Sequence, residues 1–198
     1  MTRKPAEDRK AEIIAALLAL ADSIGPDRVT TGAVAVAVGV TQAALFRHFP
    51  SKSALWLAAA EDLAARMEVA WSAALASGDT PVARLEALTA AQFGQIAATP
   101  ALPMLLFSRE LCVDNPELRV VFRCRLTEFL ALLAHEVRAA QQSGTLTEAI
   151  AAEDGAALIA ATVQGVAIRG ALGAREFDLR TEGARMVTVQ LRLLTTSA

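Results

Sequence analysis

The sequence predicts an all-α protein of about nine helices, because apolar residues recur three and four positions apart through most of the chain. No stretch shows the alternation of apolar and polar residues that is typical of a half-buried strand. Alanine raises the hydrophobic fraction to 54%, and tyrosine is absent. At 198 residues, the chain can bury a substantial core as one large or two small domains.

Charge is distributed unevenly along the chain. The formal net charge is only −2, yet all three lysines lie within the first 52 residues. A basic head and an acidic body are typical of a protein with a separate nucleic-acid-binding end, and a chance scatter of few lysines is the alternative. The basic residues of the head are Arg3, Lys4, Arg9, Lys10, Arg28, Arg47 and Lys52.

Signatures of several protein classes are missing. Charges interrupt every helical stretch before the roughly 20 apolar residues of a spanning helix accumulate, and no apolar segment follows the charged N-terminus. We therefore expect a cytoplasmic protein. Cys112 and Cys124 fit neither a zinc nor a disulfide pattern, so we expect inert thiols, with a redox switch as the alternative. His135 has no metal-binding histidine nearby, and we expect no enzyme activity, cofactor or metal.

The first helix is expected over residues 11–24 and should end at 25–27, where glycine and proline follow one another. Residues 1–10 are expected to fray, leaving Arg3 and Lys4 either solvated or within reach of DNA. The apolar face of the helix comprises Ile13, Leu17, Leu20 and Ile24.

Residues 30–49 predict two short helices separated by a tight turn. Thr30 can cap the first helix, and Gly39 can end it because glycine tolerates left-handed backbone. Thr41 then caps the second. Such a pair forms a helix-turn-helix, whose second helix lies in the major groove of DNA. The residues expected to face inward are Val34, Ala35, Val38, Leu45 and Phe49.

The second helix presents side chains suited to DNA. Gln42 can read adenine, and the small Ala43 can approach a thymine methyl. Ser51 is expected to cap the next helix, whose free N–H groups and Lys52 suit a phosphate. The predicted DNA-contacting residues are Thr30, Thr41, Gln42, Ala43, Phe46, Arg47, His48 and Lys52.

At these residues the sequence resembles the TetR family of bacterial transcriptional regulators. The family pattern IA-x-x-AGVS-x-G-x-LY-x-HF-x-SK-x-x-L stands here as VA-V-A-VGVT-Q-A-A-LF-R-HF-P-SK-S-A-L. Phe46 replaces the usual tyrosine and Ala43 the usual glycine, while Gly32 stands where a polar residue is common. The resemblance implies a DNA-binding domain over 1–52 and a larger helical ligand-binding and dimerisation domain over 53–198.

The rest of the chain also reads as helices. The longest without proline or glycine begins at Lys52 and should be about 37 Å long. Its inward residues are Leu55, Leu63, Met67 and Trp71. The expected helices are 52–76, 80–98, a short segment from 104 to 113, one to Ser143 capped by Asn115, and finally 151–173 and 178–195.

The resemblance further implies a small-molecule pocket among the central helices and a dimer in which the last two long helices of each subunit form a four-helix bundle. Core-filling aromatics and an intramolecular apolar stripe are the alternatives. The predicted pocket residues are Trp71, Phe93, Met104, Phe107, Phe122, Gln164 and Arg169. The predicted interface residues are Ile159, Val163, Val166, Gly170, Val187, Leu191 and Leu194.

Taken with the resemblance, the sequence predicts a homodimeric transcriptional repressor that binds a palindromic operator in double-stranded DNA and releases it when a small-molecule inducer enters the body. Two alternatives stay open. One is a ligand-independent architectural or cell-division factor of TetR type, and the other is a helical protein-interaction module. We expect no membrane partner.

Overall fold

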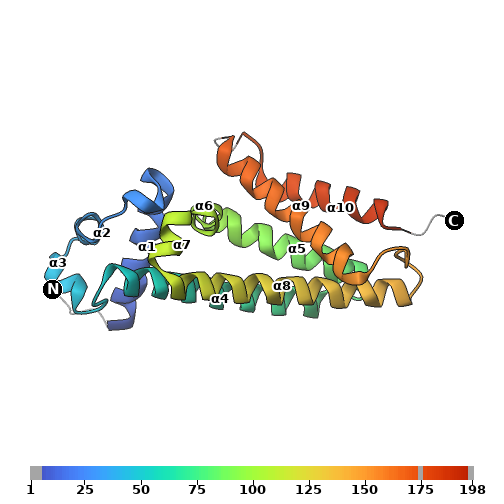
Figure 1. The fold of residues 1–198 in the computed structure, drawn as a ribbon, viewed down its shortest axis with the longest axis horizontal. Helices are drawn as coiled ribbons and strands as arrows, with labels where there is room; N and C mark the ends of the chain where they lie inside the picture. Colours follow the sequence, from blue (N-terminus) through green and yellow to red (C-terminus); the bar gives the residue numbers. More distant parts are fainter. Residues whose placement is uncertain (1–5, 174–175, 196–198) are drawn as a thin grey trace. The chain divides into compact units, whose positions relative to one another are not determined.

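The computed structural model describes residues 6–173 and 176–195, which form ten α-helices and one 3-10 helix and contain no β-strand (Figure 1). The predicted all-α class is confirmed. Contacts group the chain into two compact units, which we call unit 1 (residues 1–64 and 99–122) and unit 2 (residues 65–98 and 123–198). The expected functional boundary at residue 52 stays a prediction.

Unit 1 contains the helix-turn-helix. Its first helix begins earlier than expected, because Lys10 pairs with Glu7 at 3.0 Å and Arg9 with Glu12 at 2.9 Å along the first turns. Arg3 and Lys4 lie outside the described residues. The elements are α1 (Ala6–Ile24), η1 (Pro26–Arg28), α2 (Thr31–Val38), α3 (Gln42–Phe46), the start of α4 (Lys52–Ser77), α6 (Leu102–Phe107), α7 (Arg109–Asp114) and the start of α8 (Pro116–Gln142).

Most of the predicted inward residues of unit 1 are buried. Leu20 and Val38 are half-buried, and Ile24 is 41% exposed, so its assignment to the inner face is wrong. The reason is that α1 ends there, at Gly25 with φ +86°. The buried core residues predicted correctly are Ile13, Leu17, Val34, Ala35, Leu45, Phe49, Leu55 and Leu63.

Ser108 divides the segment that was expected as one short helix. Its backbone ends α6, and its hydroxyl accepts a hydrogen bond from the N–H of Leu111 at 3.0 Å, which caps α7. The same hydroxyl donates to Oδ1 of Asp27 at 2.7 Å. This contact ties the start of α7 to η1, the turn that leads into α2.

Asn115 does not cap α8 with its side chain, as the sequence suggested. Its Nδ2 donates to the carbonyl of Leu111 at 2.9 Å, so the amide closes the end of α7. Oδ1 of Asn115 is buried and has no hydrogen-bond partner within the described residues. The helix still begins at Pro116, where the missing N–H of proline has no cost in a first turn.

Unit 2 is held together by contacts between residues far apart in sequence. It comprises the rest of α4 and α8 with α5 (Pro81–Ala98), α9 (Ala152–Leu172) and α10 (Leu179–Leu193), and α10 packs against both α5 and α9. The ring of Phe93 on α5 lies directly over Gly183 on α10. Arg84, which is also on α5, donates through Nε to Oε2 of the buried Glu136 on α8 at 2.7 Å. These pairs join α5 to α10 and to α8.

Asp178 caps α10 because its Oδ1 accepts the N–H of Thr181 at 2.7 Å. Hydrogen bonds from the side chain of Thr181 and then from its backbone N–H stabilise the carboxylate and hold the pKa of Asp178 below its ordinary value. A carboxyl group whose pKa is lowered by folding stabilises the protein above its unfolded-state pKa. That contribution is lost as the pH falls through the lower folded-state pKa.

One helix, Ala152–Leu172, is long and apolar enough to cross a membrane by length and composition alone. Within the chain, 44% of its apolar window is buried. The core helix of a soluble protein passes the same test, so this finding is weak support for a membrane span.

The contact between Phe93 and Gly183 predicts opposite effects for two alanine substitutions. A Cβ at Gly183 would lie 2.5 Å from the Phe93 ring, so Gly183→Ala should destabilise the protein by about 1–3 kcal/mol. A Cβ at Gly94, also within a helix, meets nothing within 4 Å, so Gly94→Ala should stabilise it by roughly 0.5–1 kcal/mol. Urea unfolding of both variants checks this, and equal effects would contradict the packing described.

Candidate nucleic-acid interface

The turn between α2 and α3 has the geometry expected from the sequence. Oγ1 of Thr30 accepts the N–H of Ala33 at 3.1 Å, which caps α2. Gly39 ends α2 in left-handed backbone, with φ 72° and ψ 35°. The N–H of Val40 then donates back to the carbonyl of Ala35 at 2.9 Å, as in a helix that stops at glycine. The predicted helix-turn-helix is thus confirmed.

Burial on one side of α3 fixes which side faces outward. Thr41 caps this helix by accepting the N–H of Ala44 at 3.1 Å. Leu45 is 0% exposed and Phe49 is 5% exposed. The helix ends at Phe46, earlier than expected, and Arg47 and the half-buried His48 lie in the turn that follows.

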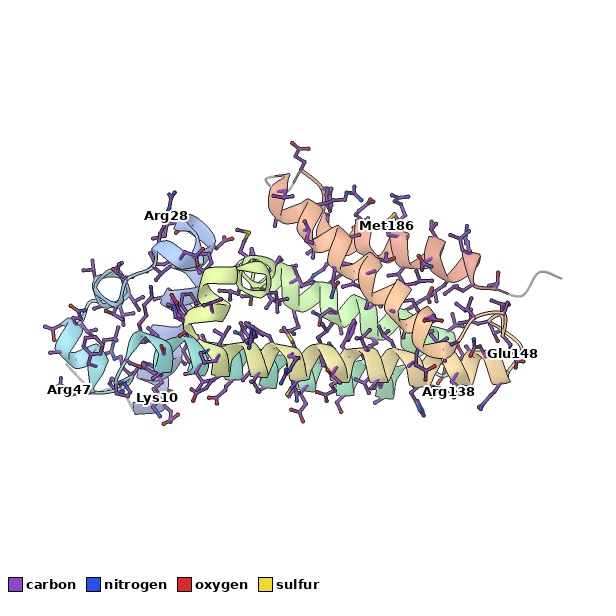
Figure 2. The ribbon with its side chains drawn as sticks, viewed as in Figure 1. Lys10, Arg28, Arg47, Arg138, Glu148 and Met186 are labelled. Atoms are coloured by element: carbon purple, nitrogen blue, oxygen red, sulfur yellow. The ribbon has the colours of Figure 1, made fainter. Side chains whose placement is uncertain are left out.

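Four side chains make up the outward face of this region. Gln42 and Phe46 lie one turn apart, as do Ala43 and Arg47, and all four are exposed. Phe46 is 39% exposed, so part of its ring can reach a partner. Arg47 extends away from the ribbon in Figure 2, as does Arg28 of η1. We call Gln42, Ala43, Phe46 and Arg47 the reading face.

The start of α4 lies next to the reading face in the chain. Oγ of Ser51 accepts the N–H of Ala54 at 3.0 Å, so the expected cap is present. Lys52 is exposed, and neither Lys52 nor Arg47 forms an ion pair with any described residue. Free backbone N–H groups at a helix start, together with a lysine, suit a phosphate oxygen.

One residue of this region was not identified from the sequence. Nε2 of Gln42 donates to Oγ1 of Thr31 at 2.8 Å, across the turn. No local signal points to this pair, because the two residues lie eleven positions apart on different helices.

The predicted pocket residues have different environments. In unit 2, Trp71 is buried, lies 5.1 Å from the ring of Phe129 and donates through Nε1 to Gln92 at 2.9 Å. Phe93 packs on Gly183, and both Gln164 and Arg169 are exposed on α9. The structure therefore does not bring these two polar residues to the buried aromatics of unit 2. In unit 1, Phe122 is buried and Met104 is 47% exposed, while the side chain of Phe107 is outside the described part.

The predicted interface residues are buried within a single subunit, and none of their apolar side chains is more than 7% exposed. They form the intramolecular stripe that the sequence also allowed. A second copy would have to meet other faces of the same two helices. The residues concerned are Ile159, Val163, Val166, Gly170, Val187, Leu191 and Leu194.

Comparison with known families decides what this domain is. Residues 13–59, which contain all of α2 and α3, match the family model described as bacterial regulatory proteins, tetR family. The helix-turn-helix domain therefore matches the TetR family. It is a DNA-binding domain of TetR type, and the resemblance stated from the sequence is confirmed.

Similar proteins are found by sequence and by structure. The nucleoid occlusion factor SlmA of a Marinomonas strain is 31% identical over 113 residues, which span 57% of this chain and 57% of that relative. A TetR-family regulator from Agrobacterium tumefaciens has the same fold, with a TM-score of 0.80, 19% identity and coverage of 97% of this chain and 100% of that chain. The regulator FadR from Bacillus subtilis, solved with stearoyl-CoA, gives a TM-score of 0.75 at 18% identity, covering 91% and 97% of the two chains.

Lys52→Ala tests the predicted phosphate contact of this domain. We expect weaker binding to all duplexes alike, and a salt slope that is smaller by about 0.9 per lost phosphate contact. Arg138→Ala is the matched control, because Arg138 is exposed in unit 2 and pairs there with Glu153. Fluorescence anisotropy over a salt series measures both quantities, and an unchanged slope for Lys52→Ala would remove this lysine from the interface.

Proposed function

We propose that the chain is a homodimeric transcriptional repressor that binds a palindromic operator and releases it on binding a small molecule. The observation that carries this proposal is the reading face, with exposed Gln42, Ala43, Phe46 and Arg47 held outward by the buried Leu45. An amide, apolar groups and a cation are the groups that read base edges and phosphates in the major groove. Thr30, Thr41, His48 and Lys52 complete the proposed contacts. A DNA-binding protein of this kind would work in the cytoplasm.

A second copy of the chain is the partner that the body favours. On α9, Leu158, Ala161, Gly165, Ile168 and Leu172 recur at helical spacing opposite the buried stripe, and Leu172 is 80% exposed. On α10, Val189 and Leu193 are 40% and 75% exposed, and Met186 points outward from the helix (Figure 2).

These two stripes belong to one layer of helices. Thr162 hydrogen-bonds Gln190 at 3.3 Å, and Arg169 pairs with Glu182 at 3.4 Å, so α9 and α10 lie side by side and antiparallel. Exposed apolar residues on two paired helices are suited to the same residues of a second copy, because a two-fold interface is self-complementary. Together, two copies form the four-helix bundle that the resemblance implies.

Substitution of this surface tests the dimer. Leu172→Glu together with Leu193→Glu should yield a monomer, because two-fold symmetry places four carboxylates in the apolar interface. Operator affinity should fall at least about 100-fold, since a single half-site offers little contact area. Val69→Glu is the control, because Val69 is 71% exposed on α4 and belongs to neither stripe. Sedimentation velocity gives the oligomeric state, and a dimer in the double variant would overturn this surface.

For a small molecule to release DNA, a conformational change at the ligand-binding site must reach the DNA-binding domain. The helix α4 is continuous from Lys52 to Ser77 and passes from unit 1 into unit 2. The Ser108–Asp27 hydrogen bond gives a second link within unit 1, from α7 to η1. A ligand that binds one arrangement of these helices more tightly shifts the equilibrium by that difference in affinity and no more. The neighbour solved with stearoyl-CoA supports a small-molecule effector for this fold.

A second candidate is a TetR-type DNA-binding factor without an inducer. Relatives named nucleoid occlusion factors favour it. The close packing of Phe93 on Gly183 and of Trp71 on Phe129 also favours it, because these aromatics then fill the core of unit 2.

Selection of bound sequences from a random duplex pool, at physiological salt, tests the proposed function. We expect an enriched palindrome whose half-sites lie about 34–36 Å apart, one helical turn of DNA or a multiple of it. Folded, dimeric protein that enriches no sequence would contradict the proposal and favour a helical protein-interaction module.

With the selected operator in hand, a screen of small molecules for release separates the two DNA-binding candidates. Release by one compound class supports the repressor. Many genomic sites that no compound releases would support the factor without an inducer.

A further inference from the structure

The contact between Thr31 and Gln42 carries an inference about sequence selectivity, which rests on the proposed function. Oγ1 of Thr31, the first residue of α2, accepts a hydrogen bond from Nε2 of Gln42, the first residue of α3, at 2.8 Å. We propose that Thr31 is a positioning residue that presents the Gln42 amide to an adenine in the major groove.

The atoms left over after this contact are the ones that adenine needs. A glutamine amide has two N–H hydrogens and one carbonyl oxygen. One hydrogen is donated to Thr31, so the second hydrogen and Oε1 remain for a base. Adenine offers N7 as an acceptor and N6–H as a donor, and a glutamine satisfies both at once. The contact with Thr31 therefore fixes the amide without consuming its reading atoms.

Thr31 is available for this role because the neighbouring threonines are already used. The hydroxyl oxygens of Thr30 and Thr41 accept the N–H groups of Ala33 and Ala44, which cap α2 and α3. Thr31 is half-buried, and its β-branched side chain has fewer rotamers than the longer side chain of the exposed Gln42. A free glutamine loses rotamer entropy when a base fixes it, and the bond to Thr31 reduces that loss before DNA arrives.

The hydroxyl of Thr31 retains its own hydrogen, because it acts only as an acceptor toward Gln42. That hydrogen can be donated to a phosphate oxygen at the edge of the groove. A chain from phosphate to Thr31 to Gln42 to adenine would strengthen each bond through polarisation, once DNA excludes water from it. Contact with the backbone and reading of the base are then coupled through one side chain.

The test compares full-length wild-type protein with Thr31→Val, Thr31→Ser, Gln42→Ala and the double variant Thr31→Val/Gln42→Ala. Valine keeps the branched shape of threonine and removes the hydroxyl, whereas serine keeps the hydroxyl. Affinity is measured for the selected operator, for operators with each half-site base pair replaced in turn, and for an unrelated duplex. Circular dichroism checks that each variant is folded.

Thr31→Val should reduce discrimination about 3- to 10-fold, the usual worth of one hydrogen bond, at the base pair that Gln42→Ala also affects. Thr31→Ser should retain wild-type discrimination. The double variant should discriminate no less than Gln42→Ala alone, because Thr31 acts through Gln42.

Two outcomes would overturn the inference while leaving the proposed function intact. One is a Thr31→Val variant that binds every duplex more weakly by the same factor. The other is a loss of discrimination that adds to that of Gln42→Ala in the double variant. If the wild-type protein shows no preference for any duplex, the proposed function itself fails.

Discussion

The left-handed backbone at Gly39 decides where the reading face can lie. A residue with a Cβ would be strained at φ 72°, so glycine lets α2 stop there and the chain turn at once into the Thr41 cap. Burial of Leu45 then sets the rotation of α3 about its own axis. Only with that rotation do Gln42 and the residues one turn later face away from the core. The placement of the proposed DNA contacts therefore depends on the turn at Gly39.

Local signals predicted the helix-turn-helix well. Each of the caps at Thr30 and Thr41, and the helix end at Gly39, involves residues no more than four positions apart. A short stretch of sequence is therefore enough to predict them. Asn115 shows the limit of such signals. Asparagine is a favoured cap residue, so Asn115 was expected to cap α8. Its side-chain amide instead donates to the carbonyl of Leu111, at the end of α7. The hydrogen bond between Thr31 and Gln42 shows another limit, because the two residues lie on different helices on either side of a turn.

Periodicity predicted one apolar face on each of α9 and α10 but not what covers it. Both helices have two apolar stripes, and the stronger one, with Ile159 and Val187, packs inside the subunit against neighbouring helices. The weaker stripe, with Leu158 and Leu172, remains exposed. A single sequence gives no sign of which stripe meets its own chain, because burial by a second copy and burial by α5 produce the same spacing.

The positions of the two tryptophans have a practical consequence. The chain has no tyrosine, and both Trp56 and Trp71 lie on α4, the first in unit 1 and the second in unit 2. Both indoles are buried, and only Trp71 has a hydrogen-bond partner within the described residues. Intrinsic fluorescence therefore arises from one residue in each unit. Replacing either tryptophan by phenylalanine leaves an emission signal from the other unit alone, on the helix that joins them.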